Sequence, residues 1–402
     1  MKYILVILDG MGDKPVKKLK GRTPLEAAKT PHMDFFARRG EVGLSRTIPN
    51  GFVPGTDIGC MSVFGYDPAK YFTGRGPLEA AELGIELKKN EIAFRCNLIT
   101  AEGEILKDFC ADHIPTADAR QLLESFNKKI KDKYGDVVRF YPGRGTGYRN
   151  LAVFNDTKGG LSRTPCTPPH DIMGKKYSDF LPRGPESEML KSLMTDSKEF
   201  FKNHLINKKR VRNGQGEASM IWLWGQGYPP SLPSYYKRFG LRGGVITAVD
   251  LVKGIAIHAG LDVIRVPGVT GFFDTNYVGK AEYAINSLRS RDFVAIHIES
   301  PDEAGHMGDA ALKIKAIEDV DRLVLGTLRR HLKEFDSYKI LLLADHYTCV
   351  ETRTHSSDAV PFFIYSNKKE KKGPKNFSEK SAKISRRPVA KGHELMNHFI
   401  RE

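Results

Sequence analysis

The sequence predicts an α/β protein in which a doubly wound, mostly parallel sheet carries a smaller inserted α+β domain. Nearly continuous apolar runs, typical of central parallel strands, alternate with helical patterns toward both ends of the chain. Acidic or histidine residues follow three of these runs directly. Between residues 92 and 214 the pattern changes to short strands around long helical segments, which indicates a separate unit.

The opening stretch is typical of strand, helix, strand, turn and helix. Residues 2–9 are an apolar run that ends at Asp9, and the Thr-Pro pair at 23–24 is typical of a helix start. A strand over 42–48 precedes a Pro-Gly turn, after which Thr56 stands where a helix can begin. Unpaired N–H groups in a first helical turn favour an anion, so Thr56 is either a nucleophile that takes up a phosphoryl group or a plain helix cap.

The middle of the chain predicts the inserted unit, with the core expected over 1–91 and 215–402 and the insert over 92–214. Strands are expected at 92–99, 104–109, 137–141 and 151–154, helices at 116–132 and 186–203, and a basic linker at 207–213. Arg149 belongs to a glycine-rich loop, which either holds a carboxylate or phosphate or is an exposed turn.

The alternating pattern resumes in the last part of the chain. Strands are expected at 220–224, 244–248, 262–266, 293–298, 339–343 and 361–365. Helices are expected at 250–259, 277–288, 310–330 and 394–399.

Composition and apolar patterning predict a soluble protein of the cytoplasm with no membrane partner. Hydrophobic residues make up 40% of 402 residues, yet no apolar run approaches the ~18 residues of a membrane span. The N-terminus reaches an acidic residue at Asp9, too early for a signal peptide. The five cysteines are widely spaced without a C-x-x-C pair, so we expect reduced, mostly buried thiols.

The net charge of +15 is concentrated near the C-terminus. Residues 368–391 hold ten Lys and Arg against two acidic residues. No aromatic residues alternate with these lysines, as a nucleic-acid groove would require, so we expect a solvated basic loop and no nucleic-acid partner.

Acidic and histidine residues at strand ends predict a metal centre. In an open parallel sheet the carboxyl ends of the strands share one edge, so these side chains should converge there. Together with Thr56 the candidate ligands are Asp9, Asp302, His306, Asp345, His346 and His355. Three Asp, three His and a hydroxyl divide into two sites, suited to Mn²⁺ or Zn²⁺ better than to Mg²⁺ alone. Two such ions about 4 Å apart can activate an alcohol and clamp a phosphoryl group.

Long motifs carry a resemblance to a known family. They are Asp-Gly at 9–10, Pro-Gly-Thr-Asp at 54–57, Phe-Gly-Tyr-Asp-Pro at 64–68, Thr-Gly-Arg-Gly-Pro-Leu-Glu-Ala-Ala at 73–81, Ala-Phe-Arg-Cys-Asn-Leu at 93–98, Trp-Leu-Trp-Gly-Gln-Gly at 222–227, Pro-Asp-Glu-Ala-Gly-His at 301–306 and Ala-Asp-His at 344–346. With these motifs the chain resembles, nearly end to end, the archaeal-type cofactor-independent phosphoglycerate mutases of the alkaline phosphatase superfamily.

The resemblance implies an alkaline phosphatase-like core, a substrate-orienting cap and roles for individual residues. Asp302, His306 and His355 would hold one divalent metal, and Asp9, Asp345 and His346 the other, beside Thr56 as the transiently phosphorylated group. Candidates for holding the substrate are His113, Arg149 and Lys280. The resemblance further implies phosphoglycerate as the substrate, Mn as the first choice of metal with Zn, Co or Mg as alternatives, and no 2,3-bisphosphoglycerate.

Two positions depart from the family pattern. The mutases carry Ser where Thr56 stands, and proline where Tyr347 follows Asp-His. The extra methyl group of Thr restricts its rotamers and crowds a phosphoenzyme. Alternatives on the same site are a phosphohydrolase and a small-alcohol phosphotransferase of the homoserine kinase kind. An alternative of another class is a binding protein that uses 368–391, and the oligomeric state is left open.

Overall fold

The chain is divided into two compact units. The computed structural model of the protein describes residues 1–144, 146–385 and 387–401. Contacts define unit 1 as Met1–Phe72 with Ser231–Glu402, and unit 2 as Thr73–Pro230. Unit 2 is thus wider than the expected insert at 92–214. The reason is that β7 (Met220–Gly227) pairs with β3 (Glu91–Glu102), on which α5 (Gly76–Glu82) packs.

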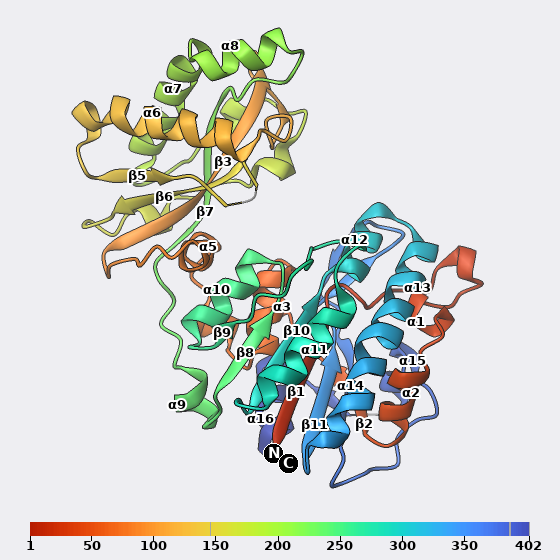
Figure 1. Ribbon diagram of the computed structural model, residues 1–402. Helices are drawn as coiled ribbons and strands as arrows, with labels where there is room; N and C mark the ends of the chain where they lie inside the picture. Colours follow the sequence, from red (N-terminus) through yellow and green to blue (C-terminus); the bar gives the residue numbers. More distant parts are fainter. Residues whose placement is uncertain (145, 386, 402) are drawn as a thin grey trace. The chain divides into compact units, whose positions relative to one another are not determined.

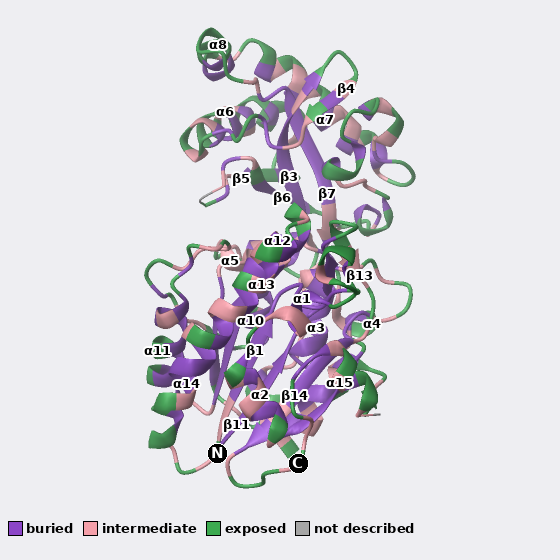
Figure 2. Cartoon of the chain, turned by 90° about the vertical axis from the view of Figure 1, so that its right-hand side faces the viewer, coloured by how far each residue is buried: buried purple, intermediate pink, exposed green. Residues whose placement is uncertain are grey.

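Unit 1 contains an eight-stranded sheet in the order β15-β2-β14-β11-β1-β10-β8-β9. The strand β1 lies between β10 and β11 and runs parallel to both, and these three strands are largely buried (Figure 2). Only β14 runs antiparallel to both of its neighbours in the described sheet. The strands are β1 (Lys2–Leu8), β2 (Glu41–Ser45), β8 (Gly243–Ile246), β9 (Asp262–Val263), β10 (Phe293–Ile298), β11 (Tyr338–Leu343), β14 (Val360–Ser366) and β15 (Pro388–Val389).

The helices of unit 1 include those expected near 250–259, 277–288 and 394–399, and other parts differ from the expectation. Four short helices lie where no helix is expected: α4 (Pro68–Tyr71), α9 (Tyr235–Phe239), α12 (Ser300–Met307) just after β10, and α15 (Glu379–Ile384). The helix expected at 310–330 is interrupted by a π-helical turn, Val320–Leu325. The strand expected at 262–266 is two residues long. Figure 1 shows the helices, which are α1 (Pro24–Ala27), α2 (Pro31–Arg38), α3 (Thr56–Val63), α4 (Pro68–Tyr71), α9 (Tyr235–Phe239), α10 (Asp250–His258), α11 (Tyr277–Leu288), α13 (Ala310–Asp319), α14 (Gly326–His331), α15 (Glu379–Ile384) and α16 (Leu395–Arg401).

Unit 2 has its own antiparallel sheet, in the order β4-β3-β6-β5 with β7 also paired to β3. Its other elements are β4 (Ile105–Asp108), β5 (Val138–Tyr141), β6 (Arg149–Asn155), α6 (Thr116–Tyr134), α7 (Ser187–Lys202) and α8 (Leu205–Arg212). The linker expected at 207–213 is wrong, because most of it belongs to α8. There Arg210 is buried and donates hydrogen bonds to Ala111 O and Gly216 O.

The basic stretch 368–391 is more ordered than the expected solvated loop. It contains α15 and β15, and β15 pairs with β2. From this stretch Lys371 and Arg387 form ion pairs with the buried Glu41 of β2. Part of its positive charge is therefore neutralised within the fold. Arg386 lies outside the described residues.

The expected state of the thiols is confirmed. All five cysteines are unpaired, and four of them are buried. Among the described residues, no helix combines the length and the apolar character needed to cross a bilayer.

Candidate active site

The side chains expected as metal ligands converge at one edge of the unit 1 sheet. Asp9 follows β1, and Asp345 and His346 follow β11. Asp302 and His306 lie on α12, just after β10. Since β1, β10 and β11 are parallel neighbours, their carboxyl ends meet at the same edge. The strand β13 (Thr354–Ser356), paired with β12 (Tyr347–Cys349), carries the remaining histidine, and α3 begins with Thr56.

Two glycines permit this close approach. Gly10 has φ of 60°, and a Cβ there would lie 2.4 Å from Thr348 Oγ1 and 2.5 Å from Asp302 Oδ1. At Gly59 a Cβ would lie 2.5 Å from Asp345 O. A side chain at either position would therefore push apart the segments that carry the ligands.

Asp302 and two histidines form the first cluster. Nε2 of His306 lies 3.3 Å from Asp302 Oδ2, and Nε2 of His355 lies 3.5 Å from Asp302 Oδ1. The Nδ1 atoms face backbone carbonyls, Arg353 O at 3.1 Å and Pro54 O at 3.2 Å. Such carbonyls fix the tautomer and leave Nε2 available to a metal. Burial raises the pKa of Asp302, but hydrogen bonds from the two histidines outweigh it and hold that pKa well below its usual value.

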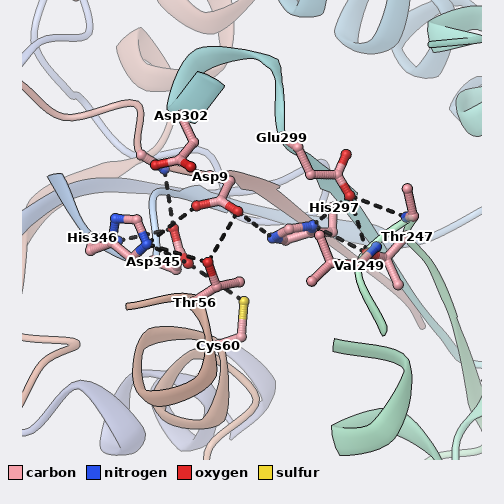
Figure 3. A network of polar contacts seen from close by, with 12 residues as sticks. Asp9, Thr56, Cys60, Thr247, Val249, His297, Glu299, Asp302, Asp345 and His346 are labelled. Atoms are coloured by element: carbon pink, nitrogen blue, oxygen red, sulfur yellow. Dashed lines mark hydrogen bonds and ion pairs between the residues drawn. The ribbon is translucent and has the colours of Figure 1, made fainter. Parts of the chain in front are cut away.

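The second cluster surrounds the Thr56 hydroxyl (Figure 3). Nε2 of His346 lies 3.4 Å from both Asp9 Oδ1 and Asp345 Oδ2. Thr56 Oγ1 lies 3.4 Å from Asp9 Oδ2 and 3.5 Å from His346 Nε2. Gly10 N donates to Asp345 Oδ1 over 3.2 Å. The hydroxyl therefore points at the carboxylates and imidazole, from the first turn of α3.

The electrostatics of the second cluster fit a bound cation. Asp9 Oδ1 is buried and accepts no hydrogen bond from the described residues. Burial, Asp345 and Asp302 all raise the pKa of Asp9 well above its usual value. Burial also lowers the pKa of His346, which favours the neutral form that binds metals. Clustered carboxylates are costly to bury without a compensating charge, which divalent cations would supply.

The two clusters are contiguous. Besides the Asp9, Asp345 and His346 group, ligand atoms of Asp302, His346 and His355 also lie within 4.8 Å of one another. The assignment of His346 to one ion alone stays a prediction.

The structure places Lys280 differently from the expectation. Its side chain is fully buried, and Nζ donates to His297 O over 2.7 Å and to Glu299 Oε2 over 3.1 Å. These contacts commit the ammonium group to the protein interior, not to a substrate.

Four neighbours of the site were missed from the sequence. His297 lies beside Asp9, Glu299 contacts the other side of the His297 ring, Cys60 donates to Asp345, and Thr348 contacts Asp302. A detectable signal was His297, a polar residue within the apolar run 293–298. Thr348 and Cys60 carried no comparable signal, because their partners come from distant segments.

In unit 2, His113 and Arg149 lie against the same tyrosine. The ring of Tyr148 is 6.2 Å from that of His113, and the Arg149 guanidinium lies 5.4 Å from its centroid. Both candidate side chains are exposed.

Further basic groups lie near Arg149 in unit 2. Arg75 and Arg95 lie over the ring of Trp224, at 5.7 and 4.4 Å from its centroid, and His170 packs against its edge. Burial lowers the pKa of His170, and Arg75, Arg95 and Arg149 lower it further, so the three guanidinium groups share its surroundings. The sequence motifs at 73–81 and 93–98 contain two of these arginines.

Comparison with known proteins identifies the family. Residues 37–207 match the profile of 2,3-bisphosphoglycerate-independent phosphoglycerate mutase. The chain is 45% identical over 403 residues to a protein of that name from Methanosarcina acetivorans, covering 100% of both chains. A solved structure from Pyrococcus horikoshii is similar with a TM-score of 0.82 and 30% identity, over 99% of this chain and 96% of the other. The cofactor-independent phosphoglycerate mutase from Thermoplasma acidophilum has a TM-score of 0.66 and 26% identity, over 100% of this chain and 99% of the other. The chain belongs to the 2,3-bisphosphoglycerate-independent phosphoglycerate mutase family.

Proposed function

We propose that this protein interconverts 3-phosphoglycerate and 2-phosphoglycerate without 2,3-bisphosphoglycerate, through phospho-Thr56. The observation that carries the proposal is the position of Thr56 Oγ1, 3.4 Å from Asp9 Oδ2 and 3.5 Å from His346 Nε2, at the start of α3. Family membership supports the same activity. In the first transfer, the bond from phosphorus to the glycerate oxygen breaks as the bond to Thr56 Oγ1 forms. In the second, the other glycerate hydroxyl takes the group back.

Two divalent ions complete this proposal. Asp302, His306 and His355 would hold one, and Asp9, Asp345 and His346 the other, beside Thr56. Bound there, the ions would activate the Thr56 hydroxyl and neutralise the charge of the transferring group. Mn²⁺ is our first choice, because the ligands mix carboxylates with imidazoles.

The N–H groups at the start of α3 have a role of their own. The first N–H groups of a helix lack partners within it and attract an anion. The N-cap residue of α3 is Gly55, so no side chain of this residue accepts a hydrogen bond from the first N–H groups of the helix. These N–H groups would therefore orient the three phosphoryl oxygens while the group is attached to Thr56.

For unit 2 we propose the role of a substrate-orienting cap on an alkaline phosphatase-like, doubly wound core. Arg75, over the ring of Trp224, provides a planar donor suited to a carboxylate or phosphate, whereas the buried Arg95 is paired with Glu79. Arg149 and His113 would contact the glycerate as it turns. Exclusion of water during that step matters, because water attacking phospho-Thr56 would release phosphate.

The decisive experiment measures both products. Purified, Mn²⁺-loaded protein is given 3-phosphoglycerate without 2,3-bisphosphoglycerate, and 2-phosphoglycerate and free phosphate are followed together. We expect isomerisation to be faster than phosphate release. Faster phosphate release would identify a phosphohydrolase, and ATP-dependent phosphorylation of homoserine would identify a phosphotransferase.

A further inference from the structure

A fourth histidine, His297, lies behind the candidate metal centre. It belongs to β10, is fully buried, and faces carboxylates with both ring nitrogens. Nε2 lies 3.4 Å from Asp9 Oδ2, and Nδ1 lies 3.1 Å from Glu299 Oε1 (Figure 3). Nδ1 also lies 3.2 Å from Thr247 Oγ1. The ring therefore links a candidate metal ligand to a second buried carboxylate.

Glu299 is itself held firmly. Its Oε1 accepts from the backbone N–H of Ala248 over 3.1 Å, and the Thr247 hydroxyl lies 3.3 Å away. Its Oε2 accepts from Lys280 Nζ over 3.1 Å, and the same ammonium donates to His297 O. Lys280, Glu299, His297 and Asp9 thus form a continuous line of polar contacts through the interior.

We propose that His297 is a positioning residue that fixes the Asp9 carboxylate for metal binding, and that Glu299 and Lys280 fix the His297 ring. The inference rests on the proposed function, because it presumes the metal centre. Its reason is the position of the ring beside Asp9. His297 Nε2 lies 3.4 Å from Asp9 Oδ2, to which the Thr56 hydroxyl donates over 3.4 Å, and among the described residues neither this ring nitrogen nor Asp9 Oδ1 has a hydrogen-bond partner. Packed against Oδ2, the ring limits rotation of the carboxylate and keeps Oδ1 at the cluster, where it lies 3.4 Å from His346 Nε2.

A different use of the same histidine is a direct metal ligand. Ligand atoms of Cys60, His297 and Asp345 lie within 4.8 Å of one another. A third ion bound there would make His297 a ligand instead of a positioning residue. Metal counting separates the two roles.

The first test measures Mn²⁺ binding without substrate, by the loss of the free Mn²⁺ signal in electron paramagnetic resonance. We compare His297→Leu, which removes both donors at similar volume, with His297→Gln, which keeps an amide donor toward Asp9. Outer-shell partners of metal ligands typically contribute 10–100-fold in affinity, so we expect about that loss in the Leu variant and a smaller loss in the Gln variant. Unchanged dissociation constants with a lower melting temperature would mean a merely structural role and would overturn the proposal.

A matched control exists in the same unit. His398 Nε2 lies 3.0 Å from Glu41 Oε1, another imidazole against a buried carboxylate. His398→Gln should change thermal stability and leave Mn²⁺ affinity as in the wild type. An equal loss of affinity in His398→Gln and His297→Leu would assign the effect to general destabilisation.

The second test addresses Glu299 and the rival role. Glu299→Gln should weaken Mn²⁺ binding, and its effect should not add to that of His297→Leu, because both act through one line of contacts. Full additivity would contradict the linkage.

Loss of one whole ion per chain in both His297→Leu and Cys60→Ser, counted by mass spectrometry of the metal, would make His297 a ligand. Since substrate is absent, these results stand even if the enzyme acts on another phosphate ester. A wild-type chain that binds no divalent ion would refute the metal centre itself.

Discussion

His306 Nε2 lies 2.9 Å from His355 Nε2, although the two residues are 49 positions apart in the chain. Both nitrogens also face the Asp302 carboxylate. The Nδ1 atom of each ring already faces a backbone carbonyl, so Nε2 is the ring atom left for a ligand. Two imidazoles and a carboxylate aimed at one point are a typical set of divalent metal ligands.

Removal of one of these imidazole rings should abolish the binding of one metal ion. We expect His355→Ala to lose one ion per chain at limiting Mn²⁺, with weakening beyond the ~10–100-fold typical of outer-shell changes. Metal content after gel filtration measures this. His331→Ala is the control, because His331 is exposed at the end of α14. Full metal content in His355→Ala would remove this residue from the ligand set.

Substitutions of Thr56, the proposed nucleophile, should distinguish the effect of its hydroxyl group from that of its methyl group. Thr56→Ala removes the oxygen, so we expect no phosphoenzyme and a loss of turnover greater than about 10³-fold. Thr56→Ser keeps the oxygen and relaxes the rotamer, so it should retain both. Intact-mass analysis after brief exposure to 3-phosphoglycerate measures the phosphoenzyme. A phosphorylated Thr56→Ala protein would exclude Thr56 as the nucleophile.

Thr348 should support both clusters through its hydroxyl. The Oγ1 atom contacts Asp302 Oδ1 and lies 3.3 Å from His346 Nδ1. Thr348→Val keeps the shape and removes these contacts, so we expect about 10–100-fold weaker Mn²⁺ binding. Thr348→Ser restores the hydroxyl and should restore affinity. Equal affinities of the Val and Ser variants would show that the hydroxyl has no such role.

Arg149 should contribute to substrate binding. Loss of a hydrogen bond to a charged group costs about 1.5–3 kcal/mol, so Arg149→Ala should raise KM about 10–100-fold. Arg139→Ala is a matched control, because Arg139 is also exposed in unit 2 and lies 5.2 Å from a tyrosine ring. Steady-state kinetics of the two variants measure the change in KM. A similar KM in both would leave Arg149 without a substrate role.

Asp321 should make stability depend on pH. Burial raises the pKa of its carboxyl to about 6, although it accepts hydrogen bonds from the N–H groups of His32 and Met33. The folded state therefore holds this proton more tightly than the unfolded state does. Asp321 contributes most to the free energy of unfolding below about pH 4, the pKa of an Asp in the unfolded chain. This contribution is lost as the pH rises through about 6, the pKa in the folded state.

Substitution by Asn removes this titration and keeps an acceptor. Relative to the wild type, Asp321→Asn should gain up to about 3 kcal/mol in the free energy of unfolding between pH 4 and 7.5. Urea unfolding of the metal-free proteins at several pH values measures the difference. A difference that does not vary with pH would contradict the raised pKa.

The convergence of the candidate ligands was predictable because its signal is local. Asp9 and Asp345 each follow an apolar run, and parallel strands place such residues at one edge. His297 was missed because its partner Asp9 follows another strand and reaches it only through the pairing of β1 with β10. Lys280 was misplaced for the same reason, since a sequence does not show which carboxylate an ammonium group meets.

The bounds of unit 2 and the structure of the C-terminal stretch differ from the expectation for another reason. The strand β7 looks like part of the core in the sequence, but its hydrogen-bond partner is β3. Residues 368–391 look solvated because of their lysines, but Glu41 on β2 compensates two of the charges. In both cases a distant partner, not local composition, determined the structure.

The place of β1 in its sheet has a consequence for protein synthesis. The strand leaves the ribosome long before its two neighbours, which begin at Phe293 and Tyr338. A nascent chain therefore carries an apolar strand with both edges open until β10 and β11 have been translated, a state prone to wrong pairing. Unit 2, which is one continuous segment, can complete its own sheet during that wait.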